Sequence, residues 1–220
     1  TIAQIRAYKP QSSSLGCGQV LPCPYTADKA RIVVQEMIDG ISLELVEKRL
    51  VTDQLVLTVG YDIENLTRPE IRKVYKGPVT TDRYGRRVPK HAHGTWNLSR
   101  ATSSSSELLE AMAALYDKIV NPALLIRRMS LSACHVVNEK MAKEREQKET
   151  FEQLDLFTDY AKKEAKEKEE QKKRERERRM QEALLTIKKK YGKNAVLRGM
   201  NFEEGATAKE RNGQIGGHQA

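Results

Sequence analysis

The chain of 220 residues has few cysteines and no long apolar run. Cys17, Cys23 and Cys134 are an odd set without a C-x-x-C pair, which argues against a disulfide framework and a zinc ribbon and fits a reducing cytoplasm. His91 and His93 lie two residues apart, but no neighbouring cysteine or third histidine completes a tetrahedral metal site. No run approaches the roughly 20 apolar residues that span a bilayer, and no charged-then-apolar signal pattern begins the chain. We therefore expect no membrane contact and no metal.

The chain is also short of acidic residues relative to basic ones. Lysine and arginine total 39 against 30 aspartates and glutamates, which gives a formal net charge of +9. This balance favours a polyanionic partner, with nucleic acid as the leading class, and makes such binding sensitive to salt. Only the first two thirds of the chain has enough apolar residues for a core, so we expect one globular domain, as a monomer, followed by a tail.

The first elements are visible in the pattern of apolar residues. Residues 12–21 suit a short strand that ends before Pro22 and Pro24. Thr26 offers an N-cap oxygen for a helix that runs towards Lys48. The apolar residues of this helix recur at spacings of three and four: Ala30, Val33, Val34, Met37, Ile38 and Ile41.

Alternating apolar residues predict two further strands with an insertion between them. One strand covers residues 55–61, and another contains Trp96 and Leu98. Residues 65–93 are rich in proline, glycine and basic side chains, which indicates an exposed hairpin or loop.

A second helix and a fourth strand complete the domain. Ser104 with Glu107 forms a capping box before an apolar stripe over residues 108–119, and a strand follows over 128–137. The order strand, helix, strand, strand, helix, strand predicts an α+β domain in which two helices cover one face of a four-stranded sheet. The other face would carry Asn97, Ser99, Arg128, Ser130 and Ser132.

The composition changes abruptly after the last strand. Residues 162–179 mix lysine, arginine and glutamate at helical spacing, which predicts a solvated helix without a core. Residues 191–220 are polar and glycine-rich and are expected to be ordered only in part. We divide the chain into residues 1–11, a domain over 12–138 and a tail over 139–220.

One apolar cluster interrupts the charged tail. Its residues read QLDLF, and Leu154, Leu156 and Phe157 cannot form a core there, which suits a peptide that enters another protein's pocket. Alternatively, these side chains pack on the chain's own domain. The pattern is similar to the pentapeptide with which bacterial polymerases and repair proteins hold the replicative sliding clamp (the beta clamp). The clamp-binding residues would be Gln153, Leu154, Asp155, Leu156 and Phe157.

Longer segments carry a family resemblance. SLGCGQVLP, YTADKA, LTVGYD, KHAHGTWNL and LLIRRMSLSACHV occur in order, and GMNFEEGATAKERNGQIGGHQA ends the chain. Together with the element order and QLDLF, they resemble the C-terminal half of a Y-family translesion DNA polymerase, its little finger domain and clamp-binding tail. These segments are most similar in sequence to the UV-damage-repair members of bacteria, phages and plasmids, which work in DNA repair and the SOS response.

The resemblance implies a role in holding primer-template DNA. In this family the little finger lies along the major groove and grips mainly phosphates. Arg127 and Arg128 would then contact the DNA backbone, although the pair would also fit a solvated surface or a cap on the sheet, and Arg86, Arg87 and Lys90 fit a solvated loop. Cys17 would face the DNA side or solvent, and Cys134 would pack in a strand. The implied DNA-binding residues are Ser14, Leu15, Gly16, Ser99, Arg100, Arg127, Arg128 and Ser130.

The resemblance also implies what the chain does not carry. Family polymerases hold Mg2+ with carboxylates of an N-terminal palm domain. Asp28, Glu36, Asp62 and Glu64 do not replace that set and are expected to be solvated or to cap elements, so residues 1–11 would be the end of a missing catalytic region. We expect no catalytic residue and no cofactor in this chain, and no polymerisation by it alone. A free-standing, non-enzymatic basic binding module and an accessory subunit of a nuclease or ligase are the alternatives.

Overall fold

The computed structural model describes residues 2, 13–149, 160–215 and 218–219. The QLDLF cluster falls outside the described residues. In the part of the chain that the structure describes, no helix is long and apolar enough to cross a membrane.

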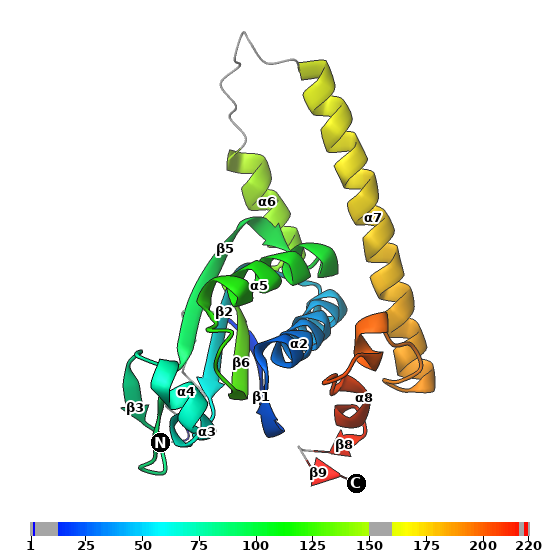
Figure 1. The fold of residues 1–220 in the computed structure, drawn as a ribbon. Helices are drawn as coiled ribbons and strands as arrows, with labels where there is room; N and C mark the ends of the chain where they lie inside the picture. Colours follow the sequence, from blue (N-terminus) through cyan, green and yellow to red (C-terminus); the bar gives the residue numbers. More distant parts are fainter. Residues whose placement is uncertain (1, 3–12, 150–159, 216–217, 220) are drawn as a thin grey trace.

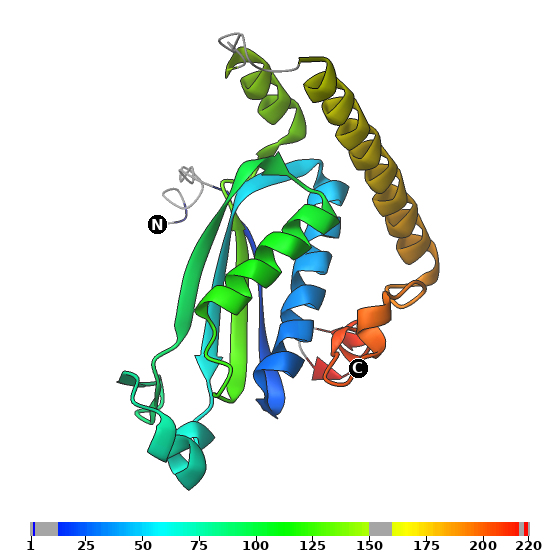
Figure 2. The same ribbon diagram turned by 45° about the horizontal axis from the view of Figure 1, so that its top comes forward.

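The domain is built on an antiparallel sheet whose main path runs β1-β6-β2-β5, with the short β7 paired to β2. This arrangement confirms the α+β class. Helices α2 and α5 lie side by side on one face of the sheet (Figures 1 and 2). The elements are β1 (Leu15–Tyr25), α2 (Ala27–Lys48), β2 (Leu50–Tyr61), β5 (Ala92–Thr102), α5 (Ser105–Ile119), β6 (Ile126–Cys134) and β7 (Val137–Asn138).

The core lies between the sheet and these two helices. Alternate residues of the two central strands point into it, so Leu57 of β2 and Leu131 of β6 are fully buried. The apolar stripes of α2 and α5 meet them. Outside the core, Arg31 on α2 donates two hydrogen bonds of 2.9 Å to Asp117 on α5 and lowers the pKa of Asp117. This tie is therefore complete at neutral pH and weakens as the pH falls through that pKa.

The first strand is longer than the sequence predicts. It does not end before Pro22 but runs through both prolines to Tyr25. β1 is the edge strand of the sheet, and its pairing with β6 shifts between Val20 and Tyr25, so a missing N–H costs no ladder hydrogen bond there. The helix that follows begins after Thr26, as expected, but the Thr26 side chain makes no cap hydrogen bond.

The insertion after β2 is more ordered than a loop. It contains two short helices and a hairpin, and its first residue, Asn65, is fully buried. Asn65 donates to the carbonyl oxygen of Leu125 at 2.7 Å and accepts from the Leu125 N–H at 2.7 Å, which ties the end of β2 to the start of β6. The elements are α3 (Glu64–Thr67), α4 (Pro69–Val74), β3 (Val79–Thr81) and β4 (Arg87–Pro89).

The charged helix after the domain is not a solvated rod throughout. Gln181 in its second half is 1% exposed and donates to the carbonyl oxygen of Ser103 at 3.0 Å. The residues beyond this helix return to α2, where Thr207 and Ala208 are buried (Figure 1). The remaining elements are α6 (Glu139–Glu149), α7 (Tyr160–Tyr191), the 3-10 helix η1 (Gly199–Phe202), α8 (Ala208–Arg211), β8 (Gln214–Ile215) and β9 (His218–Gln219).

Two glycines provide a test of the packing. A Cβ atom on Gly94 would lie 2.8 Å from Ile119 Cγ2 and 2.9 Å from Leu115 Cδ1, so β5 needs glycine there for α5 to approach. We expect Gly94→Val to lower the free energy of unfolding by about 1–3 kcal/mol. A Cβ on the exposed helical Gly40 meets nothing within 4 Å, and Gly40→Ala should raise it by about 0.5–1 kcal/mol. Urea unfolding of both variants measures the two changes; equal effects would contradict the close approach.

Candidate nucleic-acid interface

The face of the sheet opposite α2 and α5 is open and almost free of charge. Because side chains alternate along each strand, the residues next to the core positions point to this face. They are mostly glycine, serine, threonine and amides, and none is acidic. From β1 to β5 the rows are Gly16, Ser132, Val56 and Thr95; Gly18, Ser130, Thr58 and His93; and Val20, Arg128 and Gly60; Cys134, Gln54 and Asn97 extend them.

Arg128 lies flat across this face. Its cross-strand neighbour is Gly60, and a Cβ atom on Gly60 would lie 2.6 Å from Arg128 Cγ and 2.8 Å from Arg128 Nε. The glycine therefore leaves the space in which the guanidinium extends over β2. Arg128 is exposed, and the paired rows of the described strands contain no carboxylate that would neutralise its charge.

Short polar ties connect neighbouring strands on the same face. The Gln54 amide donates to Asn97 Oδ1 at 2.9 Å, and Thr58 Oγ1 shares a hydrogen bond of 2.8 Å with His93 Nδ1. These four side chains fix the surface without projecting far from it, so a large flat partner would meet hydroxyl, amide and backbone groups. The sequence pattern identified Asn97 but not its partners.

The first predicted contact segment, Ser14 to Gly16, lies at the edge of this face. Ser14 precedes β1 and is exposed, whereas Leu15 points towards the core and is half-buried. Gly16 is exposed, and a Cβ atom there would lie 2.8 Å from Ser132 Oγ. β1 is an edge strand and Gly16 has no side chain, so a phosphate could reach the backbone of this segment. The side chain of Leu15 is turned away from that surface.

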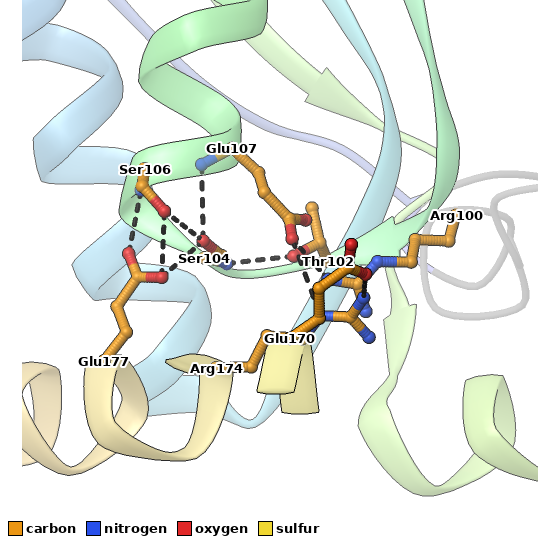
Figure 3. Close-up of polar contacts among 8 residues, drawn as sticks. All are labelled: Arg100, Thr102, Ser104, Ser106, Glu107, Glu170, Arg174 and Glu177. Atoms are coloured by element: carbon orange, nitrogen blue, oxygen red, sulfur yellow. Dashed lines mark hydrogen bonds and ion pairs between the residues drawn. The ribbon is translucent and has the colours of Figure 1, made fainter. Parts of the chain in front are cut away.

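Ser99 and Arg100 lie at the end of β5, but only Ser99 is exposed on the open face. Arg100 pairs with Glu107 on α5, and Arg174 of α7 lies 3.9 Å from the same carboxylate (Figure 3). The charge of Arg100 is therefore partly neutralised by Glu107. The two predicted residues are adjacent in sequence and face different surroundings.

Arg127 makes polar contacts with other parts of the domain. Its guanidinium donates to the carbonyl oxygen of Pro22 at 3.1 Å and lies 3.8 Å from the Asp62 carboxylate. Asp62 is 7% exposed and accepts from the Glu64 N–H at 2.8 Å, so it caps the following turn and is not solvated. The two arginines therefore differ: Arg127 connects β6 to β1 and to the end of β2, and Arg128 lies on the open face.

The helix side of the domain carries the carboxylates. On α2 and α5 they include Glu36, Asp39, Glu44, Glu47, Glu107, Glu110 and Asp117. The acidic and the uncharged faces lie on opposite sides of the sheet. Most of these carboxylates pair with cations of the chain, whereas Arg128 on the open face has no acidic neighbour in its strand rows.

The start of α5 shows a contact that the sequence pattern missed. Ser104 accepts a hydrogen bond from the Glu107 N–H, as a cap should, but Glu107 turns to Arg100 and does not complete the capping box. Glu177 of α7 occupies the helix N-terminus instead and accepts from the Ser106 N–H at 2.8 Å and the Ser104 hydroxyl at 2.7 Å (Figure 3). The four consecutive serines signalled a helix start, but nothing local to them identified the carboxylate.

The prediction for Cys17 is wrong, whereas Cys134 lies in a strand as expected. Cys17 packs against the core side of β1, not towards the open face, and Cys134 ends β6 on the open-face side. Within the described ranges, no group of three or more histidine, cysteine, aspartate or glutamate residues could hold a metal ion. The predicted clamp-binding residues 153–157 lie outside those ranges.

Comparisons with known proteins add little. No protein-family model matches the chain, and no curated protein matches it. One similar solved chain comes from a complex of the beta-clamp processivity factor and the little finger domain of PolIV. It is 8% identical to this chain with a TM-score of 0.34, and the match covers 66% of this chain and 100% of that one.

Thiol labelling tests the orientation of β1. Burial raises the pKa of Cys17 to about 11, whereas Cys23 on the same strand is exposed. At pH 8 we expect iodoacetamide to modify Cys23 at least about 100-fold faster than Cys17, because the thiolate is the reacting species. Mass spectrometry of the tryptic peptides gives both rates. Comparable rates would place Cys17 on the open face.

Proposed function

We propose that this chain is the DNA-holding and clamp-tethering part of an error-prone translesion polymerase. The observation that carries the proposal is the open sheet face, which has no carboxylate in its paired rows and presents Arg128 above Gly60. Two further observations support it: the net charge of +9, and the resemblance of the segments in these strands to Y-family sequences.

The composition of the face suits binding that does not read sequence. Hydroxyl, amide and backbone N–H groups and arginine are the usual partners of phosphate and sugar oxygens, and such contacts position DNA without distinguishing bases. Apart from Arg128, the longer side chains of the rows are held across the face: Gln54 bonds to Asn97, and His93 bonds to Thr58. A module of this kind would tolerate a damaged template.

The chemistry of such a polymerase would lie outside this chain. Nucleotide transfer in the family uses Mg2+ held by palm carboxylates. The described residues present no cluster that fits a metal ion, so the proposal assigns them no catalytic step. Their work is to bind duplex DNA.

The clamp segment would complement this weak grip. Burial of Leu154, Leu156 and Phe157 in a pocket of the sliding clamp would contribute roughly 1.5–3 kcal/mol each before ordering costs. Joining that tether to a DNA-binding domain turns the second contact into an intramolecular one. Duplex and clamp would then be held together more tightly than either alone.

Reversal of one charge tests the DNA face. Arg128→Glu should weaken duplex binding regardless of sequence and reduce the slope of log K against log salt by about 0.9 for a lost phosphate contact. Fluorescence anisotropy over a salt series measures both quantities. Lys118→Glu makes the same change of charge at an exposed site on α5 and should leave the slope nearly unchanged. An unchanged slope for Arg128→Glu would place the DNA elsewhere.

Alanine replacement of the predicted clamp-binding residues tests whether this segment tethers the chain to the clamp. The triple variant Gln153→Ala, Leu156→Ala and Phe157→Ala should lose measurable binding to the sliding clamp and keep its affinity for duplex DNA. Surface plasmon resonance with immobilised clamp measures the first, and anisotropy the second. Triple replacement by alanine of three exposed cations of α7 serves as the control and should retain clamp binding: Lys172, Lys173 and Arg176. Full clamp affinity in the anchor variant would reject the tether.

A further inference from the structure

A carboxylate in the middle of α2 is buried by the far end of the chain. Glu36 is 3% exposed, although the sequence analysis predicted that it would be solvated or cap an element. It accepts hydrogen bonds from the Asn201 amide at 2.8 Å, the Thr207 N–H at 2.8 Å and the Ala208 N–H at 3.0 Å. The Thr207 hydroxyl also lies 3.2 Å from it. Burial of a carboxylate without hydrogen-bond partners costs folding free energy. The C-terminal segment supplies these partners to Glu36, so its burial is compensated.

Further pairs continue the contact along α2. Arg198 lies 2.7 Å from Asp39, and Lys189 at the end of α7 lies 2.8 Å from Glu47. Burial raises the pKa of Asp39, and burial lowers the pKa of the neighbouring Lys188. Both shifts indicate that the charges here are held partly away from water. Three carboxylates of α2, those of Glu36, Asp39 and Glu47, are thereby matched to cations and N–H groups of the C-terminal segment.

The edge strand takes part as well. The Gln19 amide of β1 donates to Thr207 Oγ1 at 2.9 Å, and Lys29 of α2 pairs with Glu204 at 2.5 Å. The segment from Arg198 to Arg211 thus contacts both β1 and α2, and its polar groups find their partners in the domain.

The middle of α7 is fixed at a second place. Gln181 donates to the Ser105 hydroxyl at 2.8 Å, in addition to its bond with the Ser103 carbonyl oxygen. Arg178 lies 3.3 Å from Glu139, the first residue of α6. Together with Glu177 at the N-terminus of α5, these residues hold the helix where the domain ends and α6 begins (Figure 3).

From these two attachments we infer that residues 177–211 form an intramolecular clasp, which holds α7 in one direction relative to the DNA face. One attachment is at the start of α5, and the other is along α2 around Glu36. α7 has 32 residues, about 48 Å at about 1.5 Å per residue, and its second half is held between the attachments. The first half extends from the domain as a projection of fixed direction (Figures 1 and 2).

The clasp gives the tether a geometry, and this step rests on the proposed function. Residues 153–157 lie in the sequence between α6 and α7. A clamp bound there would therefore be joined to the domain on both sides, through α6 to β7 and through α7 to the clasp. Two contacts on one particle cooperate only when the connection lets both form at once. The clasp would therefore affect binding to clamp-loaded DNA, not binding to the clamp alone.

Hydrogen exchange on the full chain tests the clasp itself. Glu36→Gln keeps the size of the side chain but removes its charge and one of its two acceptor oxygens, so an amide NH2 must face either the Asn201 amide or the N–H groups of Thr207 and Ala208. We expect amides of residues 201–211 to exchange about tenfold faster or more, with the amides of β2 and β6 unchanged. Glu44→Gln is the matched control on α2, because Glu44 pairs with Lys48 and should not change exchange. Unchanged exchange in Glu36→Gln would overturn the clasp, and Arg198→Met, which breaks the second pair, should give the same pattern.

Binding assays then test its role. Glu36→Gln should bind the isolated clamp with unchanged affinity and bind clamp loaded on primed DNA about tenfold more weakly than the control. Equal affinity for the loaded complex, with faster exchange in the segment, would overturn the role of the clasp. If the unmodified chain fails to bind the isolated clamp, the tether fails, while the exchange result still decides whether the clasp exists.

Discussion

The structure depends on burial of the sheet from one side only. α2 and α5 cover the row that contains Leu57 and Leu131, and the neighbouring row, with Thr58 and Ser130, is left outside. Because a slip of one residue would exchange these rows, the core fixes the register and thereby the chemistry of the open face. The face needs no network of its own to stay in place. Its small side chains add little energy, and the apolar layer behind them sets their positions.

One-sided burial also explains how the charges are distributed. The helices have a side away from the sheet, and there the carboxylates meet cations from elsewhere in the chain: Asp117 meets Arg31, Asp39 meets Arg198, and Glu47 meets Lys189. The acidic groups are used to join elements on the helix side. The open face is left with Arg128 and neutral groups, so the local field favours an anionic partner even though the chain as a whole carries 30 acidic residues.

The sequence predicted what is periodic or local. The stripes of α2 and α5 and the alternation in β2 and β6 gave the layers, and the serine cap at Ser104 gave the start of α5. It failed where the partner is distant. Nothing near Glu36 indicates that its carboxylate meets Asn201 and Thr207, and nothing near Glu107 indicates that it turns to Arg100. For the interface, the alternation identified the face, but only the register showed that Gly60 lies under Arg128.

The C-terminal segment and the open face lie on opposite sides of the sheet. Contacts of the C-terminal segment are made to α2, α5 and the core-facing edge of β1, while the rows around Ser130 point the other way. Energetic effects add when sites share no partner, so changes in the segment and changes on the open face should act independently on stability and on duplex binding. The two sets of changes would affect each other only when one molecule binds DNA and the clamp at the same time. Under the proposed function, a rigid connection between a weak, sequence-independent grip on DNA and the clamp segment would convert two separate contacts into a single strong one.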